Sequence, residues 1–175
     1  KEIKQRTEEL LEFCDLIKFR RRTVRKLSGG MKRKLMVCRA LLTDPEILLL
    51  DEPTAGMDAL SRRQMWNLLR KLNGKNLTIL LTTHYMEEAQ NLCNRVALMD
   101  HGKLEEINTP TGLIESLGAY TVDEPGADGS TVSHYFHSRQ EAIAFLSSLT
   151  GQASLRETTL EDVFVERAGR HLMPS

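Results

Sequence analysis

Two short apolar runs, each ending abruptly in polar residues, constrain the fold of this chain more than any other feature. Residues 47–50 are apolar at every position and lead directly into Asp51-Glu52-Pro53. Residues 77–82 form a second run, which His84 follows closely. Short apolar segments between chain breakers indicate strands that are buried on both faces, as in parallel sheets. An amphipathic helix expected over residues 61–72 connects them, and this order predicts a right-handed parallel α/β unit.

The remaining sequence predicts more helices before and after this unit, and then a change of character. Apolar spacing predicts the elements of the first part: helices over 1–19, from Ser28 to about 43 and over 85–92, a hairpin over 96–107 and a helix from Pro110. Beyond Gly118 the signals are weaker: strands over 120–122 and 131–136, a loop over 125–130, and helices over 138–149 and 160–168. We therefore predict an α/β part over residues 1–118 and a small α+β appendage over residues 119–175.

Composition excludes several classes of protein. Lys and Arg number 24, as do Asp and Glu, and this zero net charge disfavours a dedicated nucleic-acid binder. Eight basic residues lie between Arg20 and Lys34, but Phe19 is the only aromatic residue beside them, so a solvated surface near a phosphate site is favoured over a base-stacking surface. No apolar run approaches the roughly 18 residues that span a membrane, so we expect membrane contact through a partner. The cysteines, Cys14, Cys38 and Cys93, form no motif and suit a reducing cytosol.

The polar residues that end the two strands are the first candidates for chemistry. The carboxyl ends of parallel strands form the crevice in which α/β sheets bind ligands. There Asp51 is placed to hold Mg²⁺, directly or through water, and Glu52 to polarise a water molecule as a general base. His84, at the end of the second strand, is placed to donate a hydrogen bond to a phosphate oxygen. The alternatives are a solvated turn for the carboxylates and a structural role for the histidine.

Two further motifs lie at expected helix starts. Ser28-Gly29-Gly30 lets the backbone approach an anion closely, with free N–H groups and the helix dipole facing it. Asp58 lies shortly after the acidic pair, where it can bond across an interface. The alternative in both cases is an N-cap, which Ser28 and Asp58 are both suited to provide.

Taken together, these motifs resemble the ABC ATPase family. Residues 27–31 (Leu-Ser-Gly-Gly-Met) look like its signature motif, and residues 47–52 look like its Walker B strand with the catalytic glutamate. Residues 55–58 resemble the D-loop, and His84 resembles the switch histidine. The order and spacing match over about residues 1–118. The resemblance therefore implies a partial P-loop NTPase fold, a RecA-like parallel sheet with a helical segment.

The resemblance also implies a mechanism. ATPases of this family work as head-to-tail dimers that sandwich ATP and Mg²⁺ at their interface. Ser28, Gly29 and Gly30 would contact the γ-phosphate of ATP held by the second ATPase subunit. Glu52 would activate water in its own subunit, where His84 would contact the same phosphate. Asp58 would couple the two sites, and a transmembrane permease would place the protein on the cytoplasmic, inner face of the membrane.

The ends of the resemblance point to a subtype and to an absence. Residues 31–34 (Met-Lys-Arg-Lys) stand where a Gln is more usual in the family. Together with residues 159–164 (Thr-Leu-Glu-Asp-Val-Phe), they make the sequence similar to the ATPase subunits of bacterial drug-, antibiotic- or nodulation-factor exporters. The Walker A pattern GxxxxGK[ST] does not occur in the sequence. We therefore expect the downstream part of a longer protein, inactive by itself, with apolar surface and a sheet edge exposed beside residues 47–50. Two alternatives stay open: a soluble ABC-like ATPase acting on DNA or ribosomes, and an inert binding or regulatory fragment.

Overall fold

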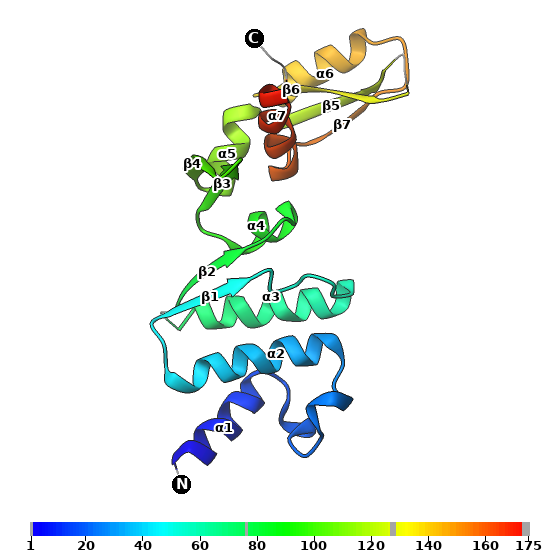
Figure 1. The fold of residues 1–175 in the computed structure, drawn as a ribbon. Coiled ribbons are helices and arrows are strands. Elements are labelled where there is room, and N and C mark those ends of the chain that lie inside the picture. Colours follow the sequence, from blue (N-terminus) through cyan, green and yellow to red (C-terminus); the bar gives the residue numbers. More distant parts are fainter. Residues whose placement is uncertain (1, 76, 127–128, 173–175) are drawn as a thin grey trace. The chain divides into compact units, whose positions relative to one another are not determined.

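The computed structural model describes residues 2–75, 77–126 and 129–172 of the chain. It forms two compact units, Lys1–His84 and Tyr85–Ser175, which we describe separately (Figure 1). The boundary expected at residue 118 falls inside the second unit and stays a prediction.

The first unit stacks helices against one small sheet. Its elements are α1 (Glu2–Phe13), the 3₁₀ turns η1 (Ile17–Phe19) and η2 (Val24–Lys26), α2 (Gly29–Ala40), η3 (Leu41–Thr43), β1 (Ile47–Asp51), α3 (Ala59–Asn73) and β2 (Thr78–Thr82). The single helix expected over residues 1–19 is wrong, because Asp15 adopts φ 59° and breaks it before η1. The α2 helix begins as predicted, capped by Ser28, and the turn that follows it stops at Asp44, which is also left-handed at φ 52°.

The two strands of the first unit are parallel and in register at their ends. Asp51 of β1 pairs with Thr82 of β2. Leu48 is buried, and the helices α1 to α3 lie on one side of the sheet (Figure 1). On the other face Ile47, Leu49 and Leu80 are 60–69% exposed.

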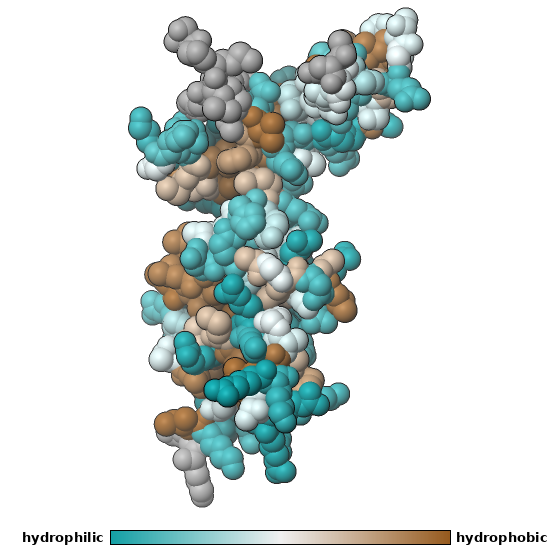
Figure 2. All heavy atoms as spheres, turned by 45° about the vertical axis from the view of Figure 1, so that its right-hand side comes forward, coloured by the Kyte–Doolittle hydropathy of each residue, from teal (hydrophilic) through white to brown (hydrophobic). Residues whose placement is uncertain are grey.

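Burial on both faces is therefore a wrong prediction for these strands. Alternate side chains of each strand point to opposite faces, and helices cover only one of them. The expected exposure of apolar surface beside residues 47–50 is present, and hydrophobic side chains are visible at the surface of the first unit in Figure 2.

The second unit contains two antiparallel sheets and four helices in the described residues. Its elements are α4 (Met86–Leu92), β3 (Val96–Asp100), β4 (Lys103–Asn108), α5 (Pro110–Leu117), β5 (Tyr120–Pro125), β6 (Thr131–Phe136), α6 (Arg139–Ser148), β7 (Ser154–Glu157) and α7 (Leu160–Leu172). The β3–β4 pair is the predicted hairpin, and β5 pairs with both β6 and β7. The loop expected over residues 125–130 includes 127–128, which lie outside the described residues.

The last helix completes the core of the second unit. The core residues come from α4, β3, α5 and α7: Ala89, Val96, Leu98, Leu113, Leu160 and Val163. Gln90 of α4 accepts a hydrogen bond of 2.9 Å from the backbone N–H of Leu160. Residues of the predicted appendage thus share a core with residues before 118.

An ion-pair cluster holds the start of α7 against the three-stranded sheet. Arg156 of β7 donates to Asp123 of β5 at 2.6 Å and to Asp162 of α7 at 2.7 Å. Burial alone would raise the pKa of either carboxyl. Hydrogen bonds from Arg156 outweigh burial and lower both pKa values. Ser133 also donates to Asp123, and the Thr159 N–H also donates to Asp162, which lowers these pKa values further.

Among the described helices, none combines the length and the apolar composition needed to cross a membrane.

Candidate functional site

The carboxylate after β1 and the imidazole after β2 meet at one end of the parallel sheet. His84 Nδ1 lies 2.9 Å from Oε1 and 2.8 Å from Oε2 of Glu52. The Glu52 backbone N–H donates to Thr82, both to its carbonyl oxygen at 3.1 Å and to Oγ1 at 3.3 Å. Glu52 has φ 47°, a left-handed conformation that is uncommon outside glycine and concentrated at functional sites. The turn therefore aims the Glu52 side chain at His84.

Asp51 is bound to the neighbouring strand rather than free in solvent. Its carboxylate accepts a hydrogen bond from the Thr82 hydroxyl, across the pair of residues that ends the parallel ladder. No group of three or more His, Cys, Asp or Glu side chains suited to a metal occurs in the described parts of the chain. A single carboxylate still fits Mg²⁺, which keeps several waters and binds through one or two carboxylates together with substrate phosphates.

The Ser28-Gly29-Gly30 motif forms the first turn of α2. Ser28 Oγ accepts from the backbone N–H of Met31 at 3.3 Å, which is the N-cap alternative raised by the sequence. A Cβ at Gly29 would meet no atom within 4 Å. A Cβ at Gly30 would lie 3.0 Å from Ser61 Oγ and 3.1 Å from Ser61 Cβ. Of the two glycines, Gly30 is therefore the one at which α2 approaches the start of α3.

Asp58 caps the helix that Gly30 approaches. Its Oδ1 accepts from the Ser61 backbone N–H at 2.9 Å and its Oδ2 from Ser61 Oγ at 2.7 Å. These two hydrogen bonds lower the pKa of Asp58. The N-cap alternative is therefore confirmed for Asp58, and Ser61 lies between Asp58 and Gly30.

The predicted residues thus fall into two groups within the first unit. One contains Asp51, Glu52 and His84 at the sheet end, and the other contains Asp58 and the start of α2. Sequence reasoning missed Thr82 and Ser61, which hold these groups in place. Thr82 was recoverable as the last residue of a strand that ends beside Asp51, whereas the contact between Gly30 and Ser61 has no local signal.

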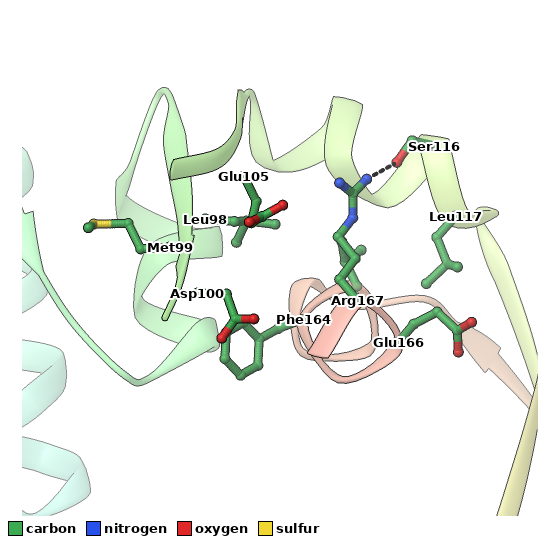
Figure 3. Close-up of a pocket in the computed structure, with 10 residues that line it drawn as sticks. Leu98, Met99, Asp100, Glu105, Ser116, Leu117, Phe164, Glu166 and Arg167 are labelled. Carbon is green, nitrogen blue, oxygen red and sulfur yellow. Dashed lines mark hydrogen bonds between the residues drawn. The ribbon is translucent and has the colours of Figure 1, made fainter. Parts of the chain in front are cut away.

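A pocket of about 340 Å³ lies in the second unit, between β3, β4, α5 and α7 (Figure 3). Leu98, Leu117 and Val163 line it, and Arg167 lies beside them. The Arg167 guanidinium already donates to Glu106 and to Ser116, the latter at 3.2 Å. None of the residues predicted to carry chemistry lines this pocket, so it does not compete with the sheet end as the candidate site.

A parallel strand pair that ends in a Glu–His contact, after a helix capped by Ser28, is the arrangement that the resemblance to nucleoside triphosphatase cassettes implies. Residues 2–55 match the family model for ABC transporters. The Nod factor export ATP-binding protein I of Burkholderia lata is 39% identical over 93% of this chain and 60% of its own length. The protein of the same name from Cupriavidus metallidurans is 38% identical over 98% of this chain and 63% of its own length. The chain belongs to the ABC transporter ATP-binding family.

Solved structures agree with this assignment. An ATP-binding cassette of an ABC transporter in its ADP conformation matches with a TM-score of 0.60 and 27% identity, over 62% of this chain and 43% of that one. CbiO1 of Clostridium perfringens, part of the CbiONQ transporter complex, matches with a TM-score of 0.61 and 26% identity, over 64% of this chain and 45% of that one. The predicted fold, a partial P-loop NTPase sheet with mixed α/β elements, is confirmed. The chain spans about 60% of the length of the curated relatives that it matches.

Proposed function

We propose that this chain carries the hydrolysis half of the ATP-binding, ATP-hydrolysing component of an ABC-type exporter. The observation that carries the proposal is the contact between Glu52 and His84 at the end of the parallel strands. The export direction is supported by the names of the relatives, which describe Nod factor export.

The three residues at the sheet end divide the chemistry. Glu52 acts as the general base that polarises the attacking water, and its hydrogen bond with His84 fixes the direction of the carboxylate. His84 stabilises the γ-phosphate as negative charge develops there. Asp51, oriented by Thr82, would hold Mg²⁺ directly or through a water molecule, and the ion would supply positive charge next to the phosphate oxygens.

The second group of residues acts on the neighbouring subunit. In an ATP-sandwich dimer, Ser28 and the backbone of Gly29 and Gly30 bind the γ-phosphate held by the partner ATPase subunit. Gly30 lies close to Ser61, and Ser61 donates a hydrogen bond to Asp58, so the start of α2 and Asp58 are held together at the proposed interface. In mixed dimers, Ser28→Arg should therefore block the partner's site and leave its own intact. Unimpaired hydrolysis at both sites would contradict the arrangement in trans.

The remaining parts of the proposal concern partners and place. A transmembrane permease receives the work of ATP hydrolysis, and the ATPase lies on the cytoplasmic, inner face of the membrane. No nucleic acid takes part. The isolated 175-residue chain hydrolyses no ATP, because the P-loop backbone and lysine that bind the phosphates in P-loop NTPases are not in its sequence.

A chimera tests this function directly. In the chimera, the chain replaces the matching 60% of the Burkholderia lata relative. The rest of that relative is to supply the phosphate-binding loop. We expect Mg²⁺-dependent ATP hydrolysis by the chimera and none by the isolated chain. Glu52→Gln should lower the turnover about 10²- to 10⁴-fold. Glu46→Gln, an exposed change of the same chemistry just before β1, should leave it unchanged. Equal turnover in the two variants would remove Glu52 from the role of base.

A further inference from the structure

The first unit carries a basic surface that the hydrolysis site does not use. Residues 16–43 contain ten Lys and Arg residues and no Asp or Glu, although the whole chain has no net charge. Seven of these cations lie exposed between η1 and the first turns of α2: Lys18, Arg20, Arg21, Arg22, Arg25, Lys26 and Lys32. We call these seven residues the basic surface.

Within the described residues, these cations have no acidic partners to neutralise them. None of the seven forms an ion pair with a carboxylate in the part of the chain that the structure describes. Exposed Lys and Arg side chains are ordinarily interspersed with acidic ones, which reduces the local field. An unpaired cluster of this size produces a positive potential that attracts an extended anionic partner.

The backbone under the basic surface is ordered by turns and buried anchors. Leu16 and Leu27, at its two ends, are 3% and 8% exposed. Between them a backbone hydrogen bond from Arg20 N to Ile17 O at 3.2 Å closes η1, and one from Lys26 N to Thr23 O at 2.9 Å closes η2. A further turn between them is closed by Arg22 N and Phe19 O at 2.8 Å. Six of the seven charges are therefore held on one short loop and Lys32 on the helix that follows it, so they meet a partner with little loss of backbone entropy.

An apolar side chain at the centre distinguishes between anionic partners. Val24 lies among the arginines and is 55% exposed. A base-stacking surface needs open aromatic rings, but the Arg22 guanidinium already covers the Phe19 ring at 5.0 Å from its centre. Cations around an exposed aliphatic side chain are instead suited to the anionic headgroups and acyl boundary of a lipid bilayer.

We propose that the basic surface binds anionic lipid headgroups and so holds the ATPase directly against the membrane. The permease then is not the only membrane contact of the protein. The proposal is independent of the proposed ATPase activity, because it needs neither nucleotide nor the residues at the sheet end.

Vesicle sedimentation tests the proposal with the 175-residue chain in the absence of nucleotide. We expect binding to vesicles of phosphatidylglycerol and phosphatidylcholine mixed 30:70, none to phosphatidylcholine alone, and loss of binding as salt rises and screens the charges. Each cation near an anionic surface strengthens binding about fivefold, so Arg20→Gln, Arg21→Gln and Arg22→Gln together should weaken it about a hundredfold.

A matched variant removes the same charge elsewhere on the first unit. Arg63→Gln, Arg70→Gln and Lys71→Gln together, on α3, should retain binding, and circular dichroism should show that both triple variants are folded. Equal weakening by the two variants, or equal binding to neutral vesicles, would overturn the proposal. So would binding to a single-stranded oligonucleotide that is tighter than binding to the anionic vesicles.

Discussion

The approach of α2 to α3 at Gly30 makes a sharp prediction from one substitution. Gly30→Ala adds a single methyl group where a Cβ would lie 3.0 Å from Ser61 Oγ and 3.1 Å from Ser61 Cβ. Ser61 cannot move aside without disturbing its two hydrogen bonds to Asp58. Gly29→Ala is the matched control, because a Cβ there meets no atom within 4 Å.

Two opposing effects set the magnitude. Alanine in a helix is more favourable than glycine by about 0.5–1 kcal/mol, and Gly29→Ala should show up to this gain. Overpacking at Gly30 costs about 1–3 kcal/mol, which exceeds that gain. We expect Gly30→Ala to destabilise the first unit by about 1 kcal/mol, so the two variants should differ by about 1.5 kcal/mol.

Urea unfolding followed by fluorescence measures this difference. Trp66 is the only tryptophan in the chain, and on α3 it is 7% exposed, so its emission reports unfolding of the first unit. With a denaturant slope of about 1.5 kcal/mol per molar urea, the midpoints should differ by about 1 M. Gly30→Ala midpoints equal to or above those of Gly29→Ala would refute the close contact between the two helices.

Three further predictions concern other contacts. Leu160→Ala should lower the stability of the second unit by about 2–5 kcal/mol, because Leu160 is fully buried. Val165 on the same helix is 61% exposed, so Val165→Ala should change the stability by less than about 0.5 kcal/mol. Hydrogen exchange of α7 measures both effects. Arg156→Met should destabilise the same unit by about 2 kcal/mol at pH 7, a value reduced for partial exposure. Its partners Asp123 and Asp162 have lowered pKa values, so their contribution to stability is present above the unfolded-state pKa of about 4 and is lost as pH falls through their folded-state pKa values. Urea unfolding should therefore show a smaller stability difference between wild type and Arg156→Met at pH 3 than at pH 7. The exposed apolar face around Leu49 should make the chain self-associate, and Leu49→Thr should reduce this association without lowering stability. Sedimentation velocity that shows the wild type and the variant equally associated would contradict this.

The elements of the fold were predictable where the signal is local. Residues 47–50 and 78–82 are strands because they are short, apolar and bounded by breakers, and Ser28 and Asp58 are caps because of their chemistry. The burial of the strands was not predictable from the same signal. An apolar run indicates that both faces of a strand can be buried, but tertiary packing decides which faces a helix covers. Leu49 is 69% exposed because no helix covers its face of the sheet in the described residues.

The candidate site was predictable to the level of strand ends. Parallel pairing brings residues after β1 and β2 to one edge, so the approach of Glu52 to His84 follows from topology. Contacts between distant elements left no trace in the sequence. Cys14 and Cys38 are far apart along the chain, yet both are buried, and the interaction with Cys38 together with burial raises the pKa of the Cys14 thiol.

The nucleotide retained by the Glu52→Gln chimera tests the central claim most directly. After incubation with Mg²⁺ and ATP and removal of free nucleotide, chromatography identifies what remains bound. A carboxylate that activates the attacking water is needed for cleavage but not for binding, so the account predicts intact ATP, bound in amounts close to one per subunit. Bound ADP, formed as fast as in the unsubstituted chimera, would contradict it.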